Sequence, residues 1–305
     1  MRIFETSKLA IDKVGLSGGE AYLVQTKECA LLYDSGFAYS APALVKEVEE
    51  LLGERALNYL FLTHSHYDHV SGSVWVKQRW PQVVVLGGAS AASILSRPGA
   101  RETICMLNKE AKETAVAFWG LDPKSVLDVD YSLLGELAVD EVVEEGQLID
   151  MGSLLFEVIE APGHTRCSLM LWCDEERLLL GSESLGVLVE GDIVVPTFLT
   201  SYAGCLESIS KAKALQPEHL LLNHKSVMSG ALATRFLQNS ENSAIKTAQT
   251  TWTLAAEGKS KEEIAAALKE MHYSGALRTF QPEAAFDLNN GYMVDLLLAT
   301  SPCAS

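Results

Sequence analysis

Three histidines and an aspartate lie within six consecutive positions of the stretch LFLTHSHYDHVSG, residues 60–72. Histidine is scarce elsewhere, with 7 in a chain of 305 residues. The cluster follows an apolar run of strand length. In extended backbone, side chains two positions apart point to the same side, so His64 and His66 can face one point. Asp68 and His69 come after the chain turns and face a neighbouring point. This single loop can therefore supply ligands to two metal ions.

Further metal-binding side chains follow other apolar runs of the sequence. His164 lies in APGHT, His224 in LLLNH and Glu183 in LLLGSES. Imidazole and carboxylate groups suit Zn²⁺, iron and Mn²⁺. A lone histidine after a strand is more often a hydrogen-bonded polar residue than a ligand, but sets of this kind seldom assemble without a metal. The sequence predicts that all of these side chains converge on one edge of a pair of packed sheets.

The negative charge of the chain argues against two classes of binding partner, nucleic acids and anionic membranes. It has 40 acidic against 24 basic residues, a formal charge of −16. Such a chain would be repelled by a phosphate backbone or an anionic membrane, so neither nucleic acid nor membrane is an expected partner. We find no apolar run of transmembrane length or signal-peptide character, and no CxxC pair among the cysteines. We expect a cytoplasmic protein that acts on a small molecule.

The predicted elements change character along the chain. Up to about residue 230, short apolar strand runs alternate with helical patterns, including helices over 41–53, 69–81 and 102–120. Two such series suggest two sheets packed face to face with helices outside. From residue 231 the pattern is helical, and Ser260 with Glu263 predicts a capping box. We predict a catalytic domain over 1–230 and a helical extension over 231–305, packed over the active-site side.

The motifs THSHYDH, APGHT, GSES and NH, in this order, resemble the metallo-β-lactamase superfamily over about residues 15–230. The resemblance implies the α/β fold class of that family, a four-layer αββα sandwich with a dinuclear site at one edge, here with a C-terminal helical extension. The ligands that it implies are His64, His66 and His164 for a first metal, Asp68, His69 and His224 for a second, and Glu183 where the family has a bridging aspartate. Asp34 matches an early aspartate that would orient a ligand.

Within the superfamily, the motifs and helical tail resemble glyoxalase II-like thioesterases, and the MLNKEAKE segment and C-terminal helices resemble the quinolone-signal response protein. The implied function is a metal-dependent hydrolase in which a metal-bridging hydroxide attacks a small ester, thioester or lactone. Asp68 would pass a proton to the leaving group. Two divalent ions are the implied cofactors, zinc first, with iron and manganese as alternatives, and a homodimer is expected by resemblance.

Two other functions stay open at this point. One is a phosphodiesterase, for which the chain is poor in basic residues. The other is a regulatory or partner-binding protein that retains a metal site with little turnover. The substituted bridging position, Glu183, gives this alternative its weight. Outside the motifs, His219 begins a strand and is expected to be structural, and His272 in the tail is expected at the surface.

Overall fold

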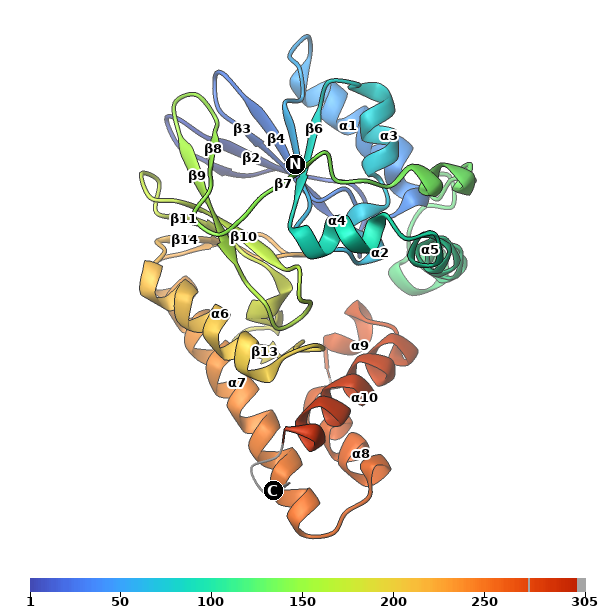
Figure 1. The fold of residues 1–305 in the computed structure, drawn as a ribbon, viewed down its shortest axis with the longest axis vertical. Coiled ribbons are helices and arrows are strands. Elements are labelled where there is room, and N and C mark those ends of the chain that lie inside the picture. The colour runs from blue at the N-terminus through green and yellow to red at the C-terminus, as the bar shows by residue number, and fades with distance from the viewer. Residues whose placement is uncertain (274, 301–305) are drawn as a thin grey trace. The chain divides into compact units, whose positions relative to one another are not determined.

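The computed structural model describes residues 1–273 and 275–300. The chain forms two compact units, whose elements are labelled in Figure 1. The first comprises residues 1–160 with 169–176, and the second comprises residues 161–168 with the chain from residue 177 onward.

The first unit contains a mixed sheet with its strands in sequence order. They are β1 Arg2–Glu5, β2 Ala10–Val14, β3 Ala21–Gln25, β4 Ala30–Tyr33, β5 Tyr59–Phe61, β6 Val84–Gly87 and β7 Glu141–Val142. Strands β3 and β4 form an antiparallel hairpin and are buried along their length, as is typical of strands covered on both faces. Strands β4 and β5 are parallel, with Tyr33 opposite Phe61. Their carboxyl ends therefore place Asp34 next to the loop that starts at Thr63.

The helices of the first unit are α1 Ala41–Leu52, α2 Tyr67–Val70, α3 Ser73–Arg79, α4 Ala89–Leu95 and α5 Pro98–Trp119, with the 3₁₀ turns η1 Ala38–Ser40 and η2 Tyr131–Glu136. Two of the three helices predicted for this unit are confirmed, as α1 and α5, and α4 is an additional helix. The single helix expected over 69–81 is wrong, because the chain divides into α2 and α3. Gly72 stands at the division, where a Cβ atom would lie 2.0 Å from the Ser35 carbonyl oxygen. This close approach requires glycine.

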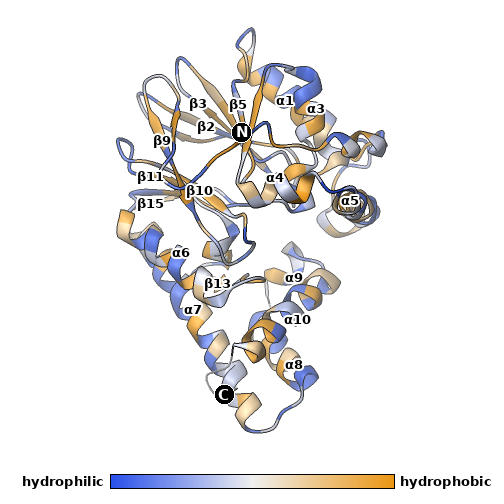
Figure 2. Cartoon of the chain, in the orientation of Figure 1, coloured by the Kyte–Doolittle hydropathy of each residue, from blue (hydrophilic) through white to orange (hydrophobic). Residues whose placement is uncertain are grey.

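Three further strands of the first unit form an antiparallel meander. They are β8 Leu148–Asp150, β9 Leu155–Glu160 and β10 Leu169–Cys173. Every residue of β10 is buried. Figure 2 shows strands such as β5 and β10 in orange, while α1 carries blue along part of its surface. The apolar strands therefore supply the core, and the helices add an amphipathic cover.

The second unit contains shorter strands around a parallel pair. Strand β11 Leu178–Leu180 is parallel to β14 His219–Leu221, which pairs antiparallel with β15 Val227–Ser229. Strands β12 Val187–Glu190 and β13 Ile193–Val195 form a hairpin. The 3₁₀ turn η3 Glu183–Leu185 and helix α6 Tyr202–Leu215 complete this part. Because β11 and β14 are parallel, Glu183 and His224 follow the same end of neighbouring strands.

The chain after residue 230 is helical, as the sequence predicts. The helices are α7 Ala231–Ala256, α8 Lys261–His272, α9 Leu277–Phe280 and α10 Glu283–Ala299. The capping box of Ser260 and Glu263 at the start of α8 is confirmed. Among the residues described, no helix combines the length and apolar character that a bilayer crossing needs. The domain boundary at residue 230 and the packing of the extension over the active-site side stay predictions.

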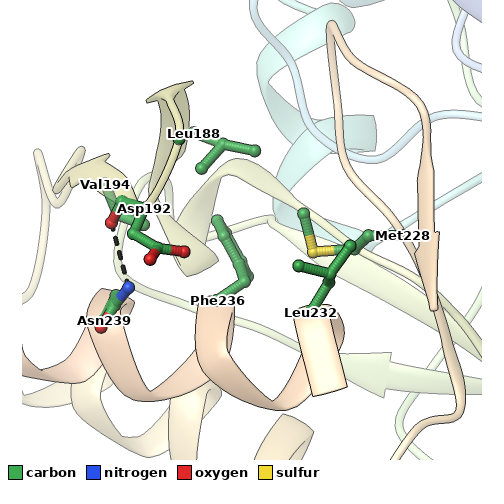
Figure 3. Close-up of a pocket in the computed structure, with 8 residues that line it drawn as sticks. Leu188, Asp192, Val194, Met228, Leu232, Phe236 and Asn239 are labelled. Carbon is green, nitrogen blue, oxygen red and sulfur yellow. Dashed lines mark hydrogen bonds between the residues drawn. The ribbon is translucent and has the colours of Figure 1, made fainter. Parts of the chain in front are cut away.

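A small apolar cavity of the second unit lies between the β12–β13 hairpin and α7 (Figure 3). Its volume is about 120 Å³, and Leu188, Met228, Leu232 and Phe236 are among the residues that line it. The Asn239 amide donates a hydrogen bond to the Asp192 carbonyl at 3.0 Å on its rim. None of the predicted metal ligands lines this cavity.

Candidate metal centre

Asp34 organises the histidine loop of the first unit. It lies at the end of β4 in the left-handed conformation, with φ 64°, and is buried. Its Oδ1 accepts a hydrogen bond from the Thr63 backbone N–H at 2.8 Å, and its Oδ2 accepts one from the Thr63 hydroxyl at 2.9 Å. The same Oδ2 lies 2.8 Å from Nδ1 of His69. One carboxylate thus holds both ends of the loop.

These contacts fix how two imidazoles present their nitrogens. A carboxylate can only accept, so Nδ1 of His69 carries the proton. The Thr63 hydroxyl gives its one proton to Asp34, so Nδ1 of His64, 2.9 Å from that hydroxyl oxygen, must donate to it. When these two imidazoles are neutral, the Nε2 atom of each therefore carries a lone pair that can bind a metal ion. Partners of this kind orient the histidines of metal sites.

The other two predicted ligands of the loop lie beside these rings. The ring of His66 meets that of His64 edge-on, with centroids 4.6 Å apart, and the two residues each offer a ligand atom within 4.8 Å of the other's. Asp68, in α2, places Oδ2 at 3.5 Å from Nε2 of His69. The first unit therefore brings together His64, His66, Asp68 and His69.

The second unit brings the remaining three predicted ligands together around Glu183. Oε2 of Glu183 lies 2.7 Å from Nε2 of His164, and Oε1 lies 2.8 Å from Nε2 of His224. The two imidazoles are buried, and the Glu183 side chain is 12% exposed. His164 directs Nδ1 at the Thr197 carbonyl oxygen, 2.7 Å away. The three residues come from three separate loops, and β11 and β14 position two of them.

The donor chemistry of this second group fits a divalent cation. A backbone carbonyl can only accept, so Nδ1 of His164 carries the proton, and the lone pair of Nε2 in the neutral ring faces a carboxylate oxygen. Two such acceptors at 2.7 Å repel each other, and a cation that binds both removes the repulsion. The two oxygens of Glu183 face different histidines, which is the arrangement that a carboxylate shared by two ions requires.

Other histidines and tyrosines of the sequence have different surroundings. His219 lies 2.7 Å from the Ser229 hydroxyl through Nδ1, which is consistent with the expected structural role. His272, expected at the surface, is buried in α8, so that expectation is wrong. Tyr67, between the predicted ligands His66 and Asp68, packs against Phe37 with ring centroids 5.6 Å apart.

Two residues that contact predicted ligands, Thr63 and Thr197, are not singled out by the sequence pattern. Thr63 directly precedes His64, and a hydroxyl beside a strand-end histidine is a sequence signal for such a contact. Thr197 acts through its backbone carbonyl, which leaves no trace in the residue type.

A match to a known protein family spans both groups of predicted ligands. The family model described as Metallo-beta-lactamase superfamily matches residues 14–224, a range that contains all of the predicted ligands. The Probable metallo-hydrolase YflN of Bacillus subtilis is 26% identical over 215 residues, which are 66% of this chain and 76% of that protein. A Hydroxyacylglutathione hydrolase of Bdellovibrio bacteriovorus is 29% identical over 107 residues, 35% of this chain and 41% of that protein.

Solved structures give the same fold. A beta-lactamase domain protein from Burkholderia ambifaria aligns with TM-score 0.61 at 18% identity, over 97% of this chain and 89% of that one. ST1585 from Sulfolobus tokodaii aligns with TM-score 0.55 at 17% identity, over 78% of this chain and 85% of that one. These matches confirm the αββα fold class with a helical C-terminal segment that the sequence predicts.

Proposed function

This chain belongs to the metallo-beta-lactamase superfamily, and we propose that it hydrolyses a small thioester or related carboxylic ester with the help of two divalent metal ions. The observation that carries the proposal is the position of Glu183, whose two oxygens each face the Nε2 atom of a different histidine. The similarity to a metallo-hydrolase supports hydrolysis. The similarity to a hydroxyacylglutathione hydrolase supports an acyl substrate.

The proposal joins the two groups of ligands around a pair of ions. Ligand bonds of about 2.0–2.2 Å need side chains that are oriented in advance. Asp34 orients His64 and His69 in this way, and the Thr197 carbonyl orients His164. We assign His64, His66 and His164 to one ion, Asp68, His69 and His224 to the other, and Glu183 to both.

The residues around the ions have separate tasks in the proposed reaction. Bound divalent ions would supply Lewis acidity, which activates water at neutral pH and polarises the substrate carbonyl. Asp68 has a side chain that is 22% exposed, more than His69 beside it. Its carboxylate can therefore reach substrate, take up a proton and return it to the departing thiolate or alkoxide. Asp34 is buried and keeps the imidazoles in place.

Zinc is our proposed metal, with iron and manganese as alternatives, because the same nitrogen and oxygen donors bind all three. Elemental analysis of the full chain, purified without chelator or added metal, distinguishes them. The homodimer and the cytoplasmic location stay predictions.

The substitution His66→Ala tests the proposal. It removes an imidazole that no other side chain of the loop can replace, so we expect loss of one bound ion and of turnover. His219→Ala, which removes a histidine outside both groups, serves as the control and should keep both. Turnover is measured with a hydroxyacyl thioester of glutathione, a lactone and a phosphodiester. Turnover by a metal-free His66→Ala variant would overturn the proposal. A fully loaded wild-type chain that is inactive on the whole panel would favour the regulatory alternative.

A further inference from the structure

Helix α5 carries a buried polar residue that the proposed chemistry does not use. Asn108 lies in the middle of the helix with an exposed fraction of 0%, on the same face as Ile104, Ala111 and Ala115. Asparagine is a weak helix former, and a buried amide costs free energy unless it is hydrogen-bonded. A leucine or alanine would suit this face better as far as packing alone is concerned.

The Asn108 amide is hydrogen-bonded to two other segments of the chain. Its Oδ1 accepts a hydrogen bond from the Ala38 backbone N–H at 2.8 Å. Its Nδ2 donates to the Ser71 hydroxyl oxygen at 2.7 Å and to the Ile104 carbonyl at 2.9 Å. The Ser71 hydroxyl in turn donates to the Tyr67 carbonyl at 2.5 Å. This chain of hydrogen bonds connects α5 to the first residue of α2.

Helix α2 depends on such outside contacts because it is short. It runs only from Tyr67 to Val70, and the carbonyls of the last turn of any helix have no partner within it. The His69 carbonyl accepts from the Ser35 backbone N–H at 2.7 Å and from the Ser35 hydroxyl at 2.8 Å. On the other side, the Tyr67 carbonyl is held by Ser71, with Asn108 behind it. Between these two fixed carbonyls lies Asp68.

We propose that Asn108 is a positioning residue of the metal site, which acts through Ser71 to fix the α2 turn that carries Asp68 and His69. The inference rests on the proposed function, because it assigns Asn108 a task toward the ion that these two side chains would hold. His64 and His66 precede α2, and His64 is held by Thr63 instead. Loss of the Asn108 amide should therefore weaken the binding of the ion that Asp68 and His69 would hold much more than the binding of the other ion.

The experiment measures metal affinity of the full chain, not turnover. Apoprotein is titrated with Zn²⁺ against a competing chelator, and with Co²⁺ to record the absorption bands of each ion. Asn108→Leu removes the amide at similar volume. Asn290→Leu is the matched control, since Asn290 is another buried mid-helix asparagine, in α10, whose amide donates to the Ala265 carbonyl at 2.8 Å. We expect about 10- to 100-fold weaker binding of one ion in Asn108→Leu, with the other unchanged, and no effect of Asn290→Leu.

Two further variants keep the test decisive if Asn108→Leu does not fold. Ser71→Ala leaves the bond between Asn108 and Ala38 intact and removes only the support of the Tyr67 carbonyl. Asn108→Asp keeps an acceptor for Ala38 but draws the Ser71 proton away from Tyr67. Both variants should weaken the binding of the same ion as Asn108→Leu does, and should alter the same cobalt absorption bands. Wild-type affinity for both ions in Ser71→Ala and Asn108→Asp would overturn this inference alone, whereas a wild-type chain that binds no metal would overturn the proposed function as well.

Discussion

The two groups of predicted ligands are built on opposite plans. In the first unit, one loop supplies all four predicted ligands, and Asp34, a carboxylate that is not itself a predicted ligand, holds this loop through Thr63 and His69. In the second unit, three loops supply one ligand each, and the carboxylate of Glu183 stands between the two imidazoles. The first group is oriented by other side chains, whereas in the second group strands β11 and β14 position Glu183 and His224 and a backbone carbonyl orients His164.

This difference determines which substitutions should be severe. In the first group the orienting atoms belong to side chains and can be removed singly. In the second group His164 is oriented by the backbone carbonyl of Thr197, which no side-chain substitution removes. The vulnerable point of the second group is therefore Glu183 itself.

Glu183→Gln is the substitution with the largest expected effect. It removes the negative charge while it keeps the length of the side chain, so no carboxylate remains to be shared by two ions. Because such ions contribute several kcal/mol to stabilising a transition state, we expect turnover to fall by about a thousandfold, with loss of at least one ion. Steady-state kinetics and elemental analysis check this. Glu183→Asp keeps the charge and should retain both ions. If Glu183→Gln keeps both ions and wild-type turnover, Glu183 is not a shared ligand.

His272 provides a contrast, as a buried histidine that lies in neither group. Its Nε2 lies 2.8 Å from the hydroxyl oxygen of Thr247, whose proton goes to the Ser243 carbonyl. Burial, with the charge of Lys246 adding to it, lowers the pKa of His272 from 6.5 to about 4. Between these pH values the unfolded chain binds a proton that the folded chain does not. The free energy of unfolding should be unaffected by this group above pH 6.5 and should fall by about 3 kcal/mol as the pH drops to 4.

Urea unfolding at a series of pH values measures that loss. His272→Asn should reduce the dependence between pH 6.5 and 4, while His219→Asn, at the start of β14, should leave it in place. An unchanged pH dependence in His272→Asn would show that His272 does not carry it.

Asp34→Asn has the smallest expected effect of the three and tests the orienting role in the first group. Asparagine tolerates the left-handed conformation at φ 64° as well as aspartate does, so the substitution changes hydrogen bonding and charge without adding backbone strain. We expect about 10- to 100-fold weaker metal binding, the usual consequence of removing a partner behind a ligand. Isothermal titration with Zn²⁺ measures it. Wild-type affinity would mean that the loop is held by packing alone.

The histidine loop could be predicted because its chemistry lies within a few residues. Period-2 spacing in extended backbone placed His64 and His66 together, and no long-range information was needed. The helix expected over 69–81 failed at Gly72, because the approach of the Ser35 carbonyl to that glycine is a tertiary contact. Composition and periodicity do not show which distant backbone segment lies against a given residue in the fold.

For two buried polar residues, His272 and Asn108, the helical spacing of the sequence already indicates burial. His272 lies four and eight residues after Leu268 and Ile264, which are both buried, so helical spacing places it on the packed face of α8. Asn108 likewise shares a face with Ile104 and Ala111. A polar residue on an otherwise apolar helical face is a signal for a buried hydrogen bond. Its partners, Ala38 and Ser71, could not be named without the fold.

The central claim is that both groups of ligands bind the same pair of ions. Anomalous diffraction from crystals of the full chain, recorded at the absorption edge of the bound metal, tests it most directly. The account predicts two peaks, one bound by His64, His66 and His164, the other by Asp68, His69 and His224, with Glu183 bound to both. Metal coordinated by the residues of one group alone, or crystals without any transition metal after loading with Zn²⁺, Fe²⁺ and Mn²⁺, would contradict it.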